Sequence, residues 1–215
     1  MNETALLIAA TLAAGTPLAL AALGLIVNEK AGVLNLGCEG MLLIAAVTGF
    51  AATFVTGNPW LGFAAGALAG ALTAAVFGLL VIFLNTNQYA TGLAISLFGG
   101  GFSAFIGLPY VGKKLPEQPA WAIPWLADIP FVGPALFKQH PLVYAAMAVA
   151  LALTWFYGRT RSGLVLRALG ENPDSAHALG YPVRLLRLGC VMAGGALCGV
   201  AGAFLSVVYA PLWVE

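Results

Sequence analysis

The sequence predicts an all-α, polytopic membrane protein, and three observations lead to this prediction. Hydrophobic residues make up 61% of the 215 residues and charged residues only 8%. A soluble domain has about 25% charged residues, so this chain is too apolar to cover itself with a water-facing surface. Its apolar residues also come in unbroken runs, whereas a membrane β-barrel needs alternating apolar and polar positions.

The apolar runs predict about six membrane-spanning helices within one transmembrane domain, residues 1–215. A helix crosses a bilayer with about twenty mainly apolar residues. We interpret the first run as a retained span, because no positively charged segment of a secretory signal precedes it. The predicted spans cover residues 4–27, 41–56, 60–84, 89–107, 141–157 and 188–209.

Two connecting segments differ in their basic residues, which predicts the orientation. Residues 158–187 carry five arginines, and residues 108–140 carry three lysines. Because Arg and Lys accumulate on the cytoplasmic side, we expect a cytoplasmic loop at 158–187 and an extracytoplasmic loop at 108–140. Alternation then places the N-terminus outside, unless the segment 28–40 changes the count.

Composition and motifs argue against several functions. A net charge of +1 gives no reason to expect a nucleic-acid partner. Three cysteines in apolar runs (Cys38, Cys190 and Cys198) resemble buried apolar residues, and His140 and His177 stand alone, so we expect neither disulfides nor a metal site. No phosphate-binding loop or hydrolase signature occurs, so we expect no catalytic residue and no ATP bound by this chain.

The polar, glycine-broken segment 28–40 predicts a broken helix between the first two spans. Transporters often place such breaks at the substrate site. Glu39 is a costly carboxylate at membrane depth, so it and Asn35 are candidate substrate-pathway residues. The alternative is an ordinary turn in which Glu39 favours the start of the next helix. Weaker pathway candidates at the start of the fourth span are Asn87, Gln88 and Thr91.

A short capped helix is predicted in the arginine-rich loop. Asn172 can cap it, Pro173 suits its first position, Asp174 favours its positive end and Gly180 can close it. A helix of about seven residues is marginal alone in water, so we expect it to dock on a partner. Lipid headgroups are the alternative surface. Ala176 and Leu179 give the helix a small apolar face, and Arg167 can pair with acidic groups of a partner.

Glycines at four-residue spacing predict close helix packing in two spans. Gly62, Gly66 and Gly70 share one face of the third span, and Gly195 and Gly199 share one face of the sixth. Small residues at this spacing let a neighbouring helix approach closely. We therefore interpret these glycines as structural.

Two segments resemble the permease subunits of ABC importers for nucleosides and simple sugars. The sequence NEKAGVLNLGCEGMLLIAA at 28–46 is similar to the motif that follows the first span in that family. The sequence RTRSGLVLRALGENPDSAHALGYPV at 159–183 is similar to its ATPase-coupling loop, with Ser175 where alanine is common. The stretch 194–207 resembles the family's next helix. The second motif adds Gly170 and Glu171 to the coupling residues named above.

The resemblance implies a multi-pass permease of the bacterial inner membrane and a set of partners. These are a second permease subunit, cytosolic ATPase subunits that bind the ATP, an extracytoplasmic binding protein or lipoprotein, and membrane lipid. Relatives usually continue beyond the stretch matched at 209–215, so we expect further C-terminal helices to be missing here. Rival hypotheses are an ATPase-independent transporter or channel, a membrane scaffold, and a membrane enzyme.

Overall fold

The computed structural model describes residues 3–118, 121–122, 133 and 136–214. Within them, six helices are long and apolar enough to cross a membrane, which confirms the predicted fold class. Two spans end in a π-helical turn and one in a 3₁₀ turn. The spans are α1 (Glu3–Lys30), α2 (Cys38–Thr56), α3 (Pro59–Gly78) with η1 (Leu79–Phe83), α4 (Gln88–Gly107) with η2 (Leu108–Tyr110), α6 (Pro141–Arg159), and α9 (Val183–Phe204) with η3 (Leu205–Tyr209).

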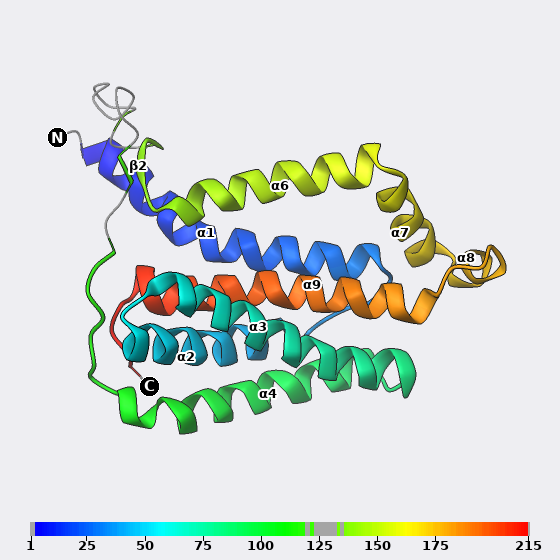
Figure 1. Ribbon diagram of the computed structural model, residues 1–215, viewed down its shortest axis with the longest axis horizontal. Helices are drawn as coiled ribbons and strands as arrows, with labels where there is room; N and C mark the ends of the chain where they lie inside the picture. Colours follow the sequence, from blue (N-terminus) through cyan, green and yellow to red (C-terminus); the bar gives the residue numbers. More distant parts are fainter. Residues whose placement is uncertain (1–2, 119–120, 123–132, 134–135, 215) are drawn as a thin grey trace.

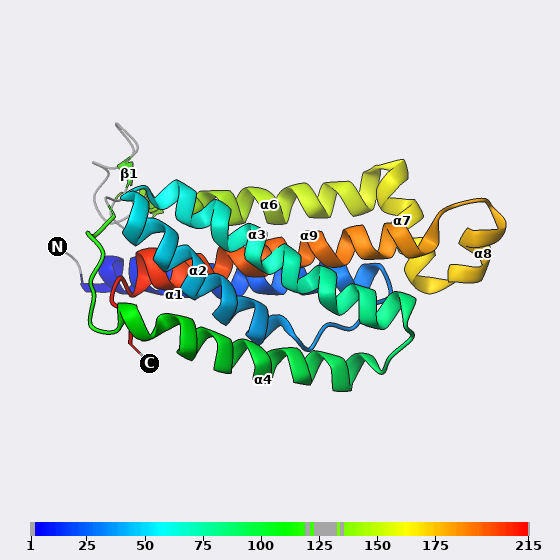
Figure 2. The same cartoon turned by 60° about the horizontal axis from the view of Figure 1, so that its bottom comes forward.

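The spans lie side by side, and two shorter helices stand at one end of the bundle (Figure 1). These are α7 (Arg161–Glu171) and α8 (Pro173–Ala178). The same end, called the α8 end below, holds the turns after α1 and after η1. Both chain termini lie at the opposite end, and the turned view shows α8 projecting beyond the spans (Figure 2). All five arginines fall at or near the α8 end, because they lie in or beside the segment that joins α6 to α9.

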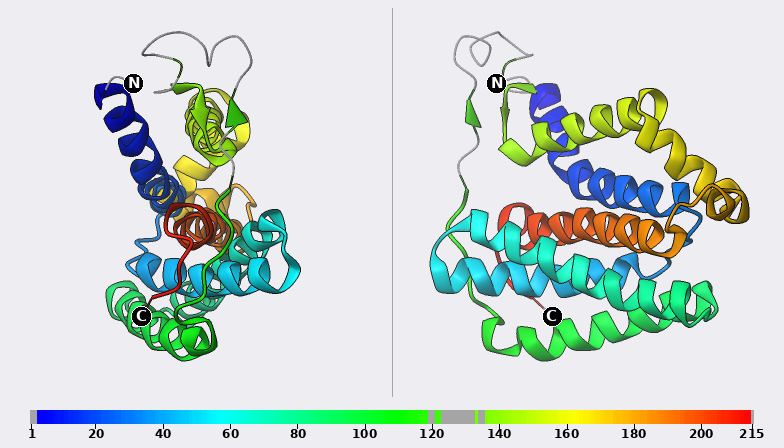
Figure 3. Two further views of the ribbon diagram at one scale, coloured as in Figure 1. Left: turned by 90° about the vertical axis from the view of Figure 1, so that its left-hand side faces the viewer. Right: turned by 45° about the vertical axis from the view of Figure 1, so that its right-hand side comes forward.

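Helix α9 is the most enclosed of the spans. It packs against α1 on one side and against α2 and α3 on the other, whereas α4 and α6 lie at the periphery (Figures 1 and 3). Its buried side chains include Val191, Phe204 and Val207. Helix α9 is therefore the central helix of the bundle.

Three expectations about element boundaries need correction. The predicted break at 28–40 is narrower, because α1 continues through Lys30 and α2 already begins at Cys38. Residues 161–171 form α7, where the sequence predicted no helix. This helix is amphipathic, and its many polar residues make the segment look like a loop when only hydropathy is considered. Helix α8 ends at Ala178, with Leu179 as its cap.

The predicted extracytoplasmic loop 108–140 contains a small antiparallel pair, β1 (Trp121–Ala122) with β2 (Lys138–Gln139). Residues 119–120, 123–132 and 134–135 of this loop lie outside the described residues. Lys114 bridges to Leu212 beyond the last span, so the start of the loop is paired with the end of the described chain.

Candidate functional site

Asn35 lies in the turn between α1 and α2, residues 31–37, which is named the 31–37 turn. Its side chain is 6% exposed, and its Oδ1 accepts a hydrogen bond of 2.9 Å from the main-chain N–H of Gly37. Its Nδ2 lies 3.5 Å from the sulfur of Met41. A carboxamide that bonds its own backbone two residues on stabilises a turn. Asn35 is therefore placed to fix the turn's shape.

The turn is joined to α4, which brings two predicted pathway segments together. The Oε1 of Gln88 accepts a hydrogen bond of 2.7 Å from the main-chain N–H of Leu34. The Oγ of Ser96 donates to the carbonyl of Leu36 at 2.9 Å. A methyl group at Gly40 would overlap the carbonyl oxygen of Ile95, so α2 begins in backbone contact with α4.

The other predicted pathway residues have different surroundings. Glu39 is exposed in the first turn of α2, where a negative charge is favourable beside the helix N-terminus. Asn87 caps α4, with its Oδ1 accepting from the main-chain N–H groups of Tyr89 and Ala90. The hydroxyl of Thr91 lies 2.9 Å from that of Thr86. Asn87 and Thr91 thus order the turn before α4.

Helix α8 has defined ends despite its six residues. The Oδ1 of Asn172 accepts from the main-chain N–H of Ser175 at 3.0 Å, and Pro173 occupies the first turn. Gly180 has a φ of +86°, and its main-chain N–H donates to the carbonyl of His177. The main-chain N–H of Tyr181 donates to the carbonyl of Ala176. This pair of bonds is a Schellman motif, which satisfies the last carbonyls of a helix.

The two residues predicted to form an apolar face, Ala176 in α8 and Leu179 at its cap, do not lie on one buried face. Ala176 is 4% exposed and packs on the protein, whereas Leu179 is 78% exposed. Asp174, Glu171 and Arg167 are also exposed. The outer surface of this segment therefore combines one prominent leucine with charges of both signs.

The end of α7 rests on the turn after α1. A methyl group at Gly170 would overlap the carbonyl oxygen of Lys30 and lie 3.1 Å from the nitrogen of Gly32. Gly32 has a φ of +77°, which favours glycine. Arg187 of α9 donates from Nη2 to the carbonyl of Leu169 at 3.4 Å, beside the same contact. Sequence reasoning missed this junction, because its parts are far apart in the chain.

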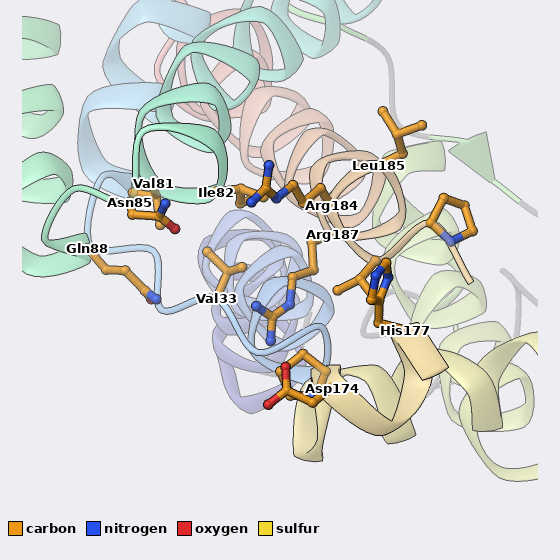
Figure 4. A pocket seen from close by; sticks show the side chains of 13 residues that line it. Val33, Val81, Ile82, Asn85, Gln88, Asp174, His177, Arg184, Leu185 and Arg187 are labelled. Carbon is orange, nitrogen blue, oxygen red and sulfur yellow. The ribbon is translucent and has the colours of Figure 1, made fainter. Parts of the chain in front are cut away.

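A cavity of about 730 Å³ opens between α8, the start of α9, η1 and the 31–37 turn. Figure 4 shows Arg187 extending from α9 toward Asp174, with Gln88 and Asn85 on the other side of Val33. The cavity therefore links the predicted coupling segment to the turn and to Gln88. Its lining residues are Val33, Val81, Ile82, Asn85, Gln88, Pro173, Asp174, His177, Pro182, Val183, Arg184, Leu185 and Arg187.

The structure places the two predicted glycine faces against each other. Methyl groups at Gly70 and Gly199 would overlap the carbonyl oxygens of Gly195 and Gly66, respectively. Gly62 instead faces α2, where a methyl group would overlap the hydroxyl of Thr53. The glycines thus permit backbone contact between α3 and α9 and between α3 and α2.

A second close approach in the bundle was not predicted. A methyl group at Gly24 of α1 would overlap the carbonyl oxygen of Gly194 of α9. A methyl group at Gly194 would overlap the carbonyl oxygen of Gly24 and the side-chain oxygen of Asn28. Asn28 lies beside Gly194 and is fully buried. Within the part of the chain that the structure describes, neither polar atom of its side chain has a hydrogen-bond partner. The sequence shows Asn28 only as an asparagine at the end of an apolar run. An asparagine also suits an exposed helix end, so this position did not indicate a buried contact.

Residues 7–213 match the family described as the permease component of branched-chain amino acid transport systems. The chain belongs to this family. The match includes both the 31–37 turn and α8, so the geometry described above lies within the family's region.

Three curated relatives are similar to the chain. It is 41% identical to TsgC13 of Haloferax volcanii, provisionally named a glucose ABC transporter permease protein, over 100% of this chain and 66% of that protein. It is 31% identical to the nucleoside ABC transporter permease protein NupC of Lactococcus lactis, over 94% of this chain and 68% of that protein. It is 35% identical to the guanosine ABC transporter permease protein NupQ of Bacillus subtilis, over 92% and 66%.

The chain thus spans about two thirds of the length of the curated relatives it matches. No solved structure gives a significant match.

Proposed function

We propose that the chain is a transmembrane permease subunit of an ABC importer for a nucleoside or a simple sugar. Its family and the names of its relatives support this class of transporter. The same relationship supports a role in transport and not in catalysis, with ATP bound by partner subunits. Its six apolar spans support a multi-pass location in a membrane, which we propose is the cytoplasmic membrane of a bacterium.

The contact of Gly170 with Lys30 and Gly32 carries the proposal. It couples the segment that holds α8 to the turn that a substrate pathway would use. In the proposed orientation α8 faces the cytoplasm, consistent with the arginines at that end. Leu179 and its charged neighbours then form the surface on which a cytosolic ATPase docks.

The proposed mechanism transmits motion through this junction. Closure of the ATPases on ATP displaces α8 and α7, and the contact at Gly170 moves the turn. The hydrogen bond from Leu34 to Gln88 passes the displacement to α4. A second permease subunit completes the pathway within membrane lipid, and a binding protein or lipoprotein delivers the solute on the far side.

A pull-down with the cognate ATPase tests the proposal. The purified chain, solubilised in detergent, should bind the ATPase, and Leu179→Asp and Glu171→Arg should each abolish binding. Leu212→Asp is a matched control, because Leu212 is an exposed leucine at the opposite end of the bundle and should leave binding unchanged. A well-folded chain that binds no ATPase would instead favour an ATPase-independent transporter.

A further inference from the structure

Two of the three cysteines meet inside the bundle although 160 residues separate them. The Sγ atoms of Cys38 and Cys198 lie 2.9 Å apart. Cys38 is the first residue of α2, and Cys198 lies in the second half of α9. The side chains are 7% and 0% exposed, so the contact is enclosed by protein.

The surroundings keep the two thiols together. The Sγ of Cys198 lies 3.8 Å from the carbonyl oxygen of Ala21, and a methyl group at Gly24 would approach it to 3.0 Å. Helix α1 therefore packs directly against the thiol of Cys198. Both thiols belong to one apolar cluster that also contains Met41.

Cys190 provides an internal comparison. It is also buried, at 7% exposed, but it packs in a separate cluster with Val27, Ala31 and Tyr157. All three cysteines are thus buried, and the contact between their thiols distinguishes Cys38 and Cys198 from Cys190.

We propose that Cys38 and Cys198 form an oxidisable thiol pair that closes to a disulfide joining α2 to α9. A disulfide needs an S–S separation of about 2.05 Å, so the two sulfurs would have to approach by less than about 1 Å from their observed 2.9 Å contact. The oxidant in this proposal is an apolar hydroperoxide, because oxidants of this class partition into the bilayer that surrounds the helices. The proposal is independent of the solute and of the partners.

The reaction balances in two steps. One thiol attacks the hydroperoxide, its sulfur takes the terminal oxygen as a sulfenic acid, and an alcohol leaves. The second sulfur attacks the sulfenic sulfur, the S–S bond forms, and the displaced hydroxyl leaves as water with the second thiol's proton. Two electrons pass from the thiols to the O–O bond of the peroxide.

The disulfide would fix the end of the 31–37 turn. Cys38 directly follows that turn, so a bond to Cys198 ties the start of α2 to the most enclosed span. A cross-link over this long loop also restricts the unfolded chain. The oxidised protein should therefore unfold at a higher temperature than the reduced protein.

Thiol counting by mass spectrometry tests the proposal. The purified chain in detergent is treated with cumene hydroperoxide, unfolded in SDS, alkylated and weighed. Wild type should show one alkylated thiol, and three after reduction. Cys190→Ser should show none before reduction and two after it, whereas Cys38→Ser and Cys198→Ser should each keep two in both conditions. A peptide map should join Cys38 to Cys198 within one chain.

Three alkylated thiols in treated wild-type protein that elutes as a single folded species would overturn the proposal. A cross-linked peptide containing Cys190, or a bond between two chains on a non-reducing gel, would overturn it equally. Wild type and Cys190→Ser both retain the pair, so the result does not depend on whether the other two variants fold.

Discussion

The main-chain N–H of Leu34 donates a 2.7 Å hydrogen bond to the side-chain oxygen of Gln88, although 54 residues separate them. This bond ties the turn between α1 and α2 to the first residue of α4. It joins two segments that the sequence suggested separately as parts of a substrate pathway, and it gives Gln88 a structural role beside any contact with solute.

Replacing Gln88 by Leu should loosen the turn, because Leu34 loses its acceptor. The loss of one such bond costs about 0.5–1.5 kcal/mol, so solute uptake should fall several-fold while the protein level in membranes stays constant. Gln88→Glu keeps an acceptor oxygen and should retain most uptake. Equal losses in the two variants would indicate that the amide nitrogen, not the bond to Leu34, is required.

Replacing Glu39 by Ala should impair uptake more than membrane insertion. The side chain is exposed in the isolated chain, so its removal leaves no buried group unpaired. Uptake in cells and the amount of protein in washed membranes would be measured together. Glu39→Gln separates charge from shape, and normal uptake by the alanine variant at normal protein level would remove Glu39 from the pathway.

A methyl group on the packed face of α3 should destabilise the bundle. Gly70→Ala places that methyl against the carbonyl of Gly195, and overpacking of this kind costs about 1–3 kcal/mol. The thermal unfolding temperature in detergent should fall. Gly101→Ala is the matched control, because among the described residues no atom beyond its own stretch of helix lies within 4 Å of the added methyl group. Its unfolding temperature should not fall.

Acidification should weaken the packing around His140. Burial lowers the pKa of His140, which lies beside the rings of Trp60, Phe63 and Phe204. The imidazole of His140 therefore binds a proton less readily in the folded state than in the unfolded state. The contribution of the neutral imidazole to stability is complete above about pH 6.5, the pKa of the unfolded state, and it is lost as the pH falls from there through the lower pKa of the folded state. Protonation also removes the Nδ1 acceptor for the N–H of Leu142.

Thermal unfolding between pH 7.5 and pH 5.5 would measure this effect. The unfolding temperature of the wild type should fall with pH over this interval. His140→Asn preserves a cap for Leu142 without a titrating group, so its decrease should be smaller. Identical pH profiles for the two proteins would assign the acid sensitivity to other groups.

Removing the cap of α8 should weaken binding of an ATPase without unfolding the bundle. Asn172→Ala leaves the N–H of Ser175 without its acceptor, at a cost of about 1 kcal/mol or roughly a five-fold loss of affinity. Asn172→Asp retains a capping oxygen and should bind as the wild type does. An alanine variant with undiminished affinity would show that the partner itself orders the helix.

The sequence alone determined the class of fold, the number of spans and the ends of α8. Hydrocarbon leaves a helix as the only way to satisfy the backbone over a long apolar run, so length and composition suffice for the spans. Asn172, Pro173 and Gly180 act through bonds to their own neighbours, so their pattern predicted α8 to within one residue. Helix α7 escaped prediction because its amphipathic pattern resembles a polar loop in a hydropathy reading.

Only the tertiary structure decided which distant groups meet. Gly170 against Lys30, Leu34 with Gln88, and Cys38 with Cys198 join parts of the chain that no local pattern connects. The glycine spacing in α3 and α9 predicted close packing but not that these two helices are each other's neighbours. Such pairings depend on how the helices pack around α9, which is a property of the whole bundle and not of any one segment.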